Sequence, residues 1–129
     1  MVDQLAEALR GHPSTPGLRL LVLHGSRARG EGRDDSDWDL GYLRTDPDVF
    51  DPAALVVAVS DVVGSDAVDL VDLASASALL RFRAARDGVA LVEHPEDAFL
   101  AFRLEAVRFW CDAGPVILAA YDDVLASLP

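Results

Sequence analysis

Cysteine is almost absent from this chain, and so are long apolar runs. Cys111 is the single cysteine among 129 residues, which excludes an internal disulfide framework and a cysteine cluster for a metal. Because it lies in a helical pattern beside Phe109 and Trp110, we expect it to be a small core or interface residue. No apolar run approaches the roughly 20 residues that span a bilayer, and no secretion signal is evident. We therefore expect no membrane association and a cytoplasmic location.

Positive charge is also scarce. The chain has 11 Lys and Arg against 22 Asp and Glu, so its formal net charge is -11. Such a chain repels polyanions, and we expect no direct binding of nucleic acid. A basic protein partner is the better electrostatic complement. The sequence has no repeats, and a hydrophobic content of 51% is ample for one core, so we predict a single domain over residues 1–129.

A glycine turn follows the first apolar run. Residues Leu18–Leu23 have the length of a buried strand and lead directly into His24-Gly25-Ser26. Gly25 allows the backbone to approach a phosphate without a Cβ in the way, and backbone N–H groups at a helix opening at Ser26 would face that phosphate. Gly25 and Ser26 are therefore candidates for binding a nucleotide, while we expect His24 to pack or to form a hydrogen bond.

The loop after this turn is highly charged. Arg27, Arg29 and Arg33 are the positive residues nearest to the turn. Each of them could contact a triphosphate, but we favour the alternative that they balance nearby loop carboxylates.

Paired carboxylates follow that loop. Alternation predicts that Asp37 and Asp39 share one face of a strand, whereas the large residues between and after them pack on the other face. Carboxylate oxygens at this spacing suit two Mg²⁺ ions, which bracket an in-line phosphoryl displacement. The overlapping pair of Asp35 and Asp37 ranks lower, because Asp35 belongs to the polar loop.

A third acid is expected from the next strand-like run, residues 67–73. Asp69 and Asp72 have opposite parity in this run, so only one of them can share the metal-binding face. We favour Asp69, which is flanked by Val68 and Leu70. Asp72 lies near the end of the run and is suited to begin a turn or to cap a helix.

The remaining pattern predicts a small mixed β-sheet flanked by helices, in the α/β (α+β) class. Strands are expected over residues 18–23, 37–43, 67–73 and 89–93, and helices over 2–9, 52–63 and 75–87, with a helical region over about 95–128. Asp51 is expected to cap the second helix, Gly64 to stop it, and Gly88 to occupy the C′ position after the third. An aromatic stripe including Phe109 is expected to belong mainly to the core. Gly114 and Pro115 leave open either two terminal helices or one kinked helix.

The combination Gly25-Ser26, ten residues, Asp37-x-Asp39, and then Val68-Asp69-Leu70 resembles the DNA polymerase β nucleotidyltransferase superfamily, specifically its minimal nucleotidyltransferase (MNT) branch. The resemblance extends over nearly the whole chain. It implies the fold of that superfamily, ATP as substrate, Gly25 and Ser26 at its phosphates, and two Mg²⁺ ions held by Asp37, Asp39 and Asp69.

The same resemblance implies a partner. In the MNT branch this is typically a HEPN-family toxin, a small helical ribonuclease encoded beside its antitoxin. The chain would then transfer AMP to a tyrosine hydroxyl of the toxin, with Asp69 helping to remove the proton, and neutralise it. The alternatives are an antitoxin that acts by binding alone and a nucleotidyltransferase acting on a small molecule such as an aminoglycoside. The second is disfavoured because the chain has no obvious acceptor domain.

Overall fold

The computed structural model describes residues 1–126, except for the side chains of residues 114, 116–118, 120, 121, 124 and 125. Four strands within this range form one mixed sheet in the order β3-β2-β1-β4. They are β1 (Leu18–His24), β2 (Trp38–Arg44), β3 (Val68–Asp72) and β4 (Val89–Glu93). β1 pairs antiparallel with both β2 and β4, and β2 pairs parallel with β3. The predicted mixed sheet is confirmed.

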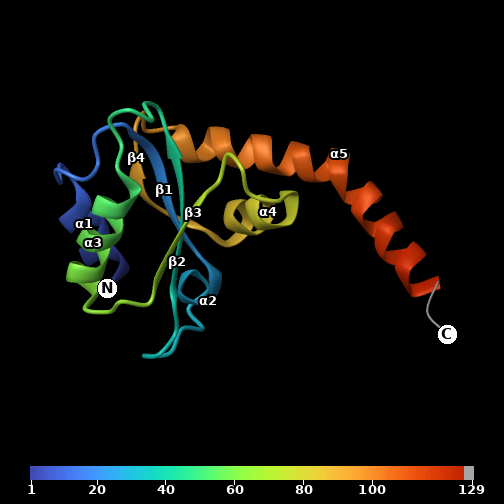
Figure 1. Ribbon diagram of the computed structural model, residues 1–129, viewed down its shortest axis with the longest axis horizontal. Helices are drawn as coiled ribbons and strands as arrows, with labels where there is room; N and C mark the ends of the chain where they lie inside the picture. Colours follow the sequence, from blue (N-terminus) through green and yellow to red (C-terminus); the bar gives the residue numbers. More distant parts are fainter. Residues whose placement is uncertain (127–129) are drawn as a thin grey trace.

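Helices cover both faces of the sheet (Figure 1). On one face, α1 (Val2–Leu9) and α3 (Pro52–Val63) pack in a core with buried residues of β1 and β2, namely Leu18, Leu21, Leu23, Trp38, Leu40 and Tyr42. On the other face lie α4 (Ala78–Asp87) and α5 (Ala98–Ala126), with a second core cluster around Phe102. The short helix α2 (Gly25–Ala28) follows β1 directly. Strand alternation thus separates two apolar layers, one on each side of the sheet.

Local signals define α3 as predicted. Asp51 accepts a hydrogen bond from the Ala53 amide at 3.0 Å, Pro52 is the first helical residue, and Gly64 ends the helix in the left-handed conformation. Glycine suits that conformation because it has no Cβ. The parallel pair of β2 and β3 is connected through this helix.

Two predictions about α4 are wrong. The helix begins at Ala78 rather than Ser75, because the hydroxyl of Ser77 caps it by accepting a hydrogen bond from the Leu80 amide at 3.2 Å. Gly88 follows the helix in an extended conformation with φ of -70°, not in the left-handed region. Glycine is needed there for space, since a Cβ would overlap the carbonyl oxygen of Ala84 and the side chain of Val22.

The terminal region is a single helix, α5, with Pro115 inside it. It bends on its way out from the sheet in Figure 1, as an internal proline explains. The predicted range of about 95–128 includes residues 127 and 128, which lie outside the described part. Phe102 is buried, but Phe109 is 44% exposed and Cys111 is exposed. The expectation of a core Phe109 is therefore wrong, because this part of α5 extends beyond the sheet. Cys111 was expected to be a core or an interface residue, and its exposure excludes the core. Among the helices of residues 1–126, none has both the length and the apolar character of a membrane span.

Candidate functional site

Gly25 in the glycine turn and Asp39 on β2 meet at one end of the sheet. Gly25 lies beside β2 because it directly follows His24, the last residue of β1, which pairs with Asp39. Gly25 has φ of +74°, and a Cβ on it would overlap Oδ2 of Asp39. The turn and the carboxylate therefore lie in direct van der Waals contact, which requires glycine at this position.

Three ionisable side chains form a row across three strands at this end. Asp39 pairs with His24 on β1 and with Asp69 on β3. Residues paired directly across neighbouring strands share one face of the sheet. Asp39 and Asp69 therefore lie on the same face, with the predicted parity, even though thirty residues separate them in the chain.

The charges in this row influence one another. Burial raises the pKa of Asp39, the nearby His24 and Arg29 oppose this, and the negative charges of Asp69 and Asp37 raise it further. Burial lowers the pKa of His24, against the effects of Asp39, the Leu40 backbone and Asp69. A cation would relieve the repulsion among the three carboxylates.

His24 was expected to pack or to form a hydrogen bond, and the structure confirms the packing. Its side chain is packed, with 8% of its surface exposed. Its Nε2 atom is buried without a hydrogen-bond partner among the described residues. Packing is confirmed, whereas a hydrogen bond from this nitrogen is not formed.

Asp37 lies just before the first residue of β2 and is exposed. Within the described residues, no three His, Cys, Asp or Glu side chains are close enough to make a preorganised metal site. The structure thus brings Asp39 beside Asp69 on the sheet and leaves Asp37 at its rim.

Asp72 has a different environment from Asp69. Its Oδ1 accepts a hydrogen bond from the Ala74 amide at 2.9 Å, and its Oδ2 is 4.0 Å from the Arg44 guanidinium. It pairs with Tyr42, so its parity is opposite to that of Asp69. Asp72 begins a turn, which was the alternative use predicted for it.

Arg27 holds the charged loop in place, a role that the sequence interpretation missed. Its guanidinium donates hydrogen bonds to the backbone carbonyls of Ser36 at 2.8 and 3.0 Å and of Arg33 at 2.9 Å. It also lies over the Trp38 ring, 4.2 Å from the centroid. Arg27 thus binds backbone oxygens rather than loop carboxylates. The five donors of a guanidinium suit such a cluster of carbonyls.

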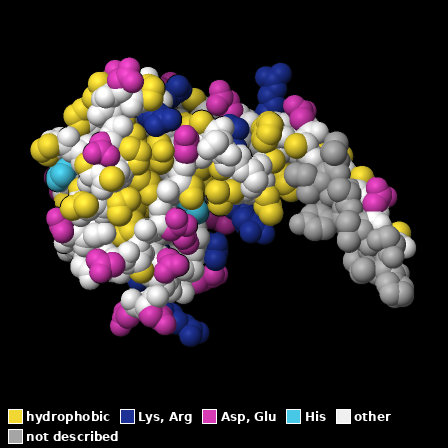
Figure 2. Space-filling view, viewed as in Figure 1, with side chains coloured by type: hydrophobic (Ala, Val, Ile, Leu, Met, Phe, Trp, Pro, Cys, Tyr) yellow, Lys and Arg dark blue, Asp and Glu magenta, His cyan; other side chains and the backbone are white. Residues whose placement is uncertain are grey.

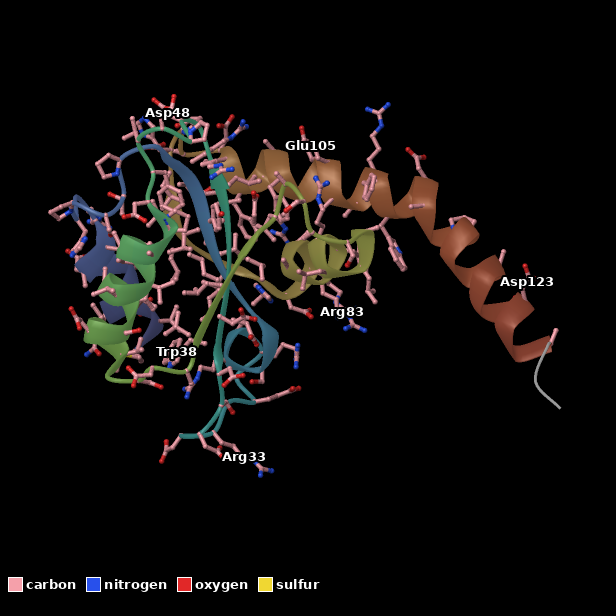
Figure 3. The ribbon with its side chains drawn as sticks, viewed as in Figure 1. Arg33, Trp38, Asp48, Arg83, Glu105 and Asp123 are labelled. Atoms are coloured by element: carbon pink, nitrogen blue, oxygen red, sulfur yellow. The ribbon has the colours of Figure 1, made fainter. Side chains whose placement is uncertain are left out.

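The other two loop arginines are more exposed. Arg29 pairs with Glu31 at 3.1 Å, as the charge-balance interpretation predicted. Figure 3 shows Arg33 at the tip of the loop, pointing away from the body of the protein.

A groove of about 840 Å³ opens elsewhere, at the opposite end of β1. Its lining comes from the α1–β1 connection and from β4, and includes His12, Pro16, Leu18 and His94. None of the candidate site residues lines it. The groove is therefore not part of the site around Asp39 and Asp69.

Comparison with known proteins shows the family to which this chain is similar. The family model described as "Polymerase beta, Nucleotidyltransferase" matches residues 4–97, which include the whole sheet. Protein adenylyltransferase MntA of Aphanizomenon flos-aquae (strain 2012/KM1/D3) is 33% identical over 106 residues, covering 74% of this chain and 71% of the relative.

Two solved structures extend the similarity to α5. A chain in a crystal structure of a toxin-antitoxin with AMP-PNP has a TM-score of 0.73 and 29% identity, with 96% of this chain and 98% of that chain covered. A chain in a structure of tri-AMPylated Shewanella oneidensis HEPN toxin in complex with MNT antitoxin has a TM-score of 0.68 and 28% identity, with 97% and 99% covered.

Proposed function

Because the chain belongs to the polymerase beta nucleotidyltransferase family, we propose that it transfers AMP from ATP to a tyrosine hydroxyl of a HEPN-family toxin and so acts as its antitoxin. The observation that carries this proposal is the contact of Gly25 with Asp39, with Asp69 beside it on β3. Nucleotidyl transfer needs a phosphate-binding turn and carboxylates in one site. The identity of the acceptor is inferred from the relatives, which include an adenylyltransferase and an MNT antitoxin bound to an AMPylated HEPN toxin.

The carboxylates of the site fit Mg²⁺. Asp37, Asp39 and Asp69 offer oxygen ligands, which this ion prefers, and the pKa of Asp39 is raised in part by neighbouring negative charges that a cation would neutralise. Asp37, Asp39 and Asp69 would hold two ions. When bound, the ions would supply positive charge to the phosphates and to the attacking oxygen.

The chain's own residues then have distinct tasks. The backbone at Gly25 and the hydroxyl of Ser26 bind the β- and γ-phosphates through hydrogen bonds. The tyrosine oxygen forms a bond to the α-phosphorus as the bond from that phosphorus to the bridging oxygen breaks, and pyrophosphate leaves. Asp69 is exposed at the edge strand, where it accepts the tyrosine proton.

Intact mass spectrometry tests this function. The chain is co-expressed with the HEPN-family protein that this proposal predicts to be encoded beside it. The chain is used as wild type, as the variant Asp37→Ala/Asp39→Ala, and as the control Asp34→Ala/Asp35→Ala. The control removes the same charge from the exposed loop. We expect AMP adducts on the HEPN protein with the wild type and the control only. A stable complex without adducts in all three would instead indicate an antitoxin that acts by binding alone. The absence of both complex and adducts would direct attention to small-molecule acceptors.

A second pair of variants tests the third carboxylate. Asp69→Asn and Asp72→Asn make the same change on one strand, at positions of opposite parity. We expect Asp69→Asn to abolish transfer and Asp72→Asn to retain it, because the amide oxygen at position 72 still accepts the turn hydrogen bond. The reverse result would assign the role to Asp72.

A further inference from the structure

Helix α5 carries two apolar faces. Ala98, Phe102 and Ala106 are buried and anchor its first half. A second set of residues on the opposite side of the helix is exposed, and we call it the outer stripe. It consists of Leu100 (58% exposed), Leu104 (66%), Val107 (44%) and Cys111.

The outer stripe is a concentration of apolar surface. Outside α5, the large exposed hydrophobic residues of the described chain occur singly, at Met1, Val49, Val57 and Val89. Figure 2 shows hydrophobic side chains at the surface along the described part of α5. Scattered exposed apolar residues are ordinary, whereas a contiguous patch indicates an interaction site.

The spacing of the outer stripe specifies the shape of its partner. Successive members are separated by four, three and four residues, which is the spacing of alternating d and a positions in a coiled coil. Such a stripe packs best against the apolar seam of another helix. A strand or an irregular loop would not match this period.

Two arginines flank the outer stripe. In the register set by the stripe, Arg103 occupies the g position of one heptad and Arg108 the e position of the next, and both are exposed. Within the described residues, neither of them forms an ion pair with a carboxylate. Residues at e and g select the partner helix by charge. The charges beside the outer stripe are positive, whereas the net charge of the whole chain is negative.

The flanking charges disfavour a second copy of α5. In a parallel pair, Arg103 of one helix faces Arg108 of the other, and in an antiparallel pair each arginine faces its own counterpart. Both arrangements bring like charges together. A helix with Asp or Glu beside its apolar seam would instead form ion pairs with both arginines.

We propose that the outer stripe of α5 binds an amphipathic helix of the acceptor protein, whose apolar seam is flanked by carboxylates. This inference rests on the proposed transfer to a protein. Four side chains make a small contact compared with the roughly 1,000 Å² of a stable interface. The stripe therefore works together with the contact at the acceptor tyrosine, and it affects how tightly the acceptor binds rather than how fast the bound acceptor reacts.

Steady-state transfer to the HEPN-family protein of the proposed function tests the proposal. Leu104→Asp places a negative charge in the stripe, and Val57→Asp makes a matched change at a position 60% exposed on α3, on the other face of the sheet. We expect Leu104→Asp to raise the KM for the acceptor about tenfold with little change in kcat, since a buried leucine contributes binding energy of that order. Val57→Asp should match the wild type.

The possible failures are distinguishable. A wild-type chain without transfer would refute the proposed function itself. An active wild type with the same acceptor KM in both variants would overturn the role of the stripe. A homodimer of the free chain that Leu104→Asp dissociates would show that a second copy occupies the stripe, and this too would overturn the proposal.

Cys111 gives a second, activity-independent measurement. It is the only cysteine of the chain and lies on the stripe, so its alkylation by a maleimide reports on coverage. In the purified complex with the HEPN protein we expect alkylation to slow at least tenfold. Unchanged alkylation in an intact complex would place the acceptor elsewhere.

Discussion

Comparing Gly25→Ala with Gly30→Ala distinguishes the effect of backbone strain from the effect of displacing Asp39. Gly25 and Gly30 both have φ of +74°, where an alanine costs about 1–2 kcal/mol. At Gly30 an added Cβ has nothing within 4 Å. At Gly25 it would overlap Oδ2 of Asp39 and lie 3.1 Å from Cγ. Gly25→Ala and Gly30→Ala therefore share the strain, and only the first displaces the carboxylate.

The size of each effect follows from these contacts. The shared strain should lower the Tm of both variants by roughly 3–10 °C for a domain of this size. In Gly25→Ala, the Asp39 carboxylate must also move by on the order of 1 Å to restore ordinary contact. A misplacement of about 1 Å in a catalytic group can cost about 100-fold in rate.

The assay is the initial rate of AMP transfer to the HEPN protein, measured well below both melting temperatures. Thermal unfolding of both variants is measured alongside. We expect similar losses of Tm, a rate near that of the wild type for Gly30→Ala, and a loss of about 100-fold for Gly25→Ala. Equal rates in the two variants would refute the contact between the turn and Asp39 as a requirement for transfer.

Three further predictions concern the scaffold. Arg27→Ala removes the hydrogen bonds to the carbonyls of Arg33 and Ser36, so limited proteolysis should cut this loop several-fold faster, whereas Arg33→Ala should leave the cleavage rate unchanged. Phe102→Ala should lower the free energy of unfolding in urea by about 3–5 kcal/mol, because the ring is buried; Phe109→Ala, at a half-exposed ring, should cost less than half as much. Asp51→Ala should lower that free energy by about 0.5–2 kcal/mol through loss of the α3 cap, and Asp51→Asn should restore most of it.

The elements that the sequence predicted best are those defined by local chemistry. α3 begins and ends at the predicted residues, because Asp51, Pro52 and Gly64 act on the backbone next to them. Gly88 shows the opposite case. Its requirement for glycine comes from Val22, a residue of a strand sixty-six positions earlier, and from the Ala84 carbonyl. No local pattern contains that contact.

The candidate site shows the same division. Alternation within β2 was enough to predict the side of the sheet on which Asp39 lies. Its alignment with Asp69 depends on the register between β2 and β3, which pairing across the sheet determines. The exposure of Phe109 was not predictable from its helical stripe, because it depends on where α5 extends beyond the sheet. The catalytic roles of these residues stay predictions until the variants above are measured.

The pairing of Asp39 with Asp69 has a consequence for how this protein can evolve. A one-residue slip between β2 and β3 would turn every side chain of β3 to the opposite face, so it would move Asp69 into an apolar layer and Leu70 out of it. Such a slip would abolish folding along with the site. Point substitutions such as Asp69→Asn change a single exposed side chain and keep the sheet. Descendants that retain the fold but have lost the chemistry should therefore differ from their ancestors at individual carboxylates rather than by insertions or deletions in the strands, and this can be checked by reconstructing the ancestral sequences.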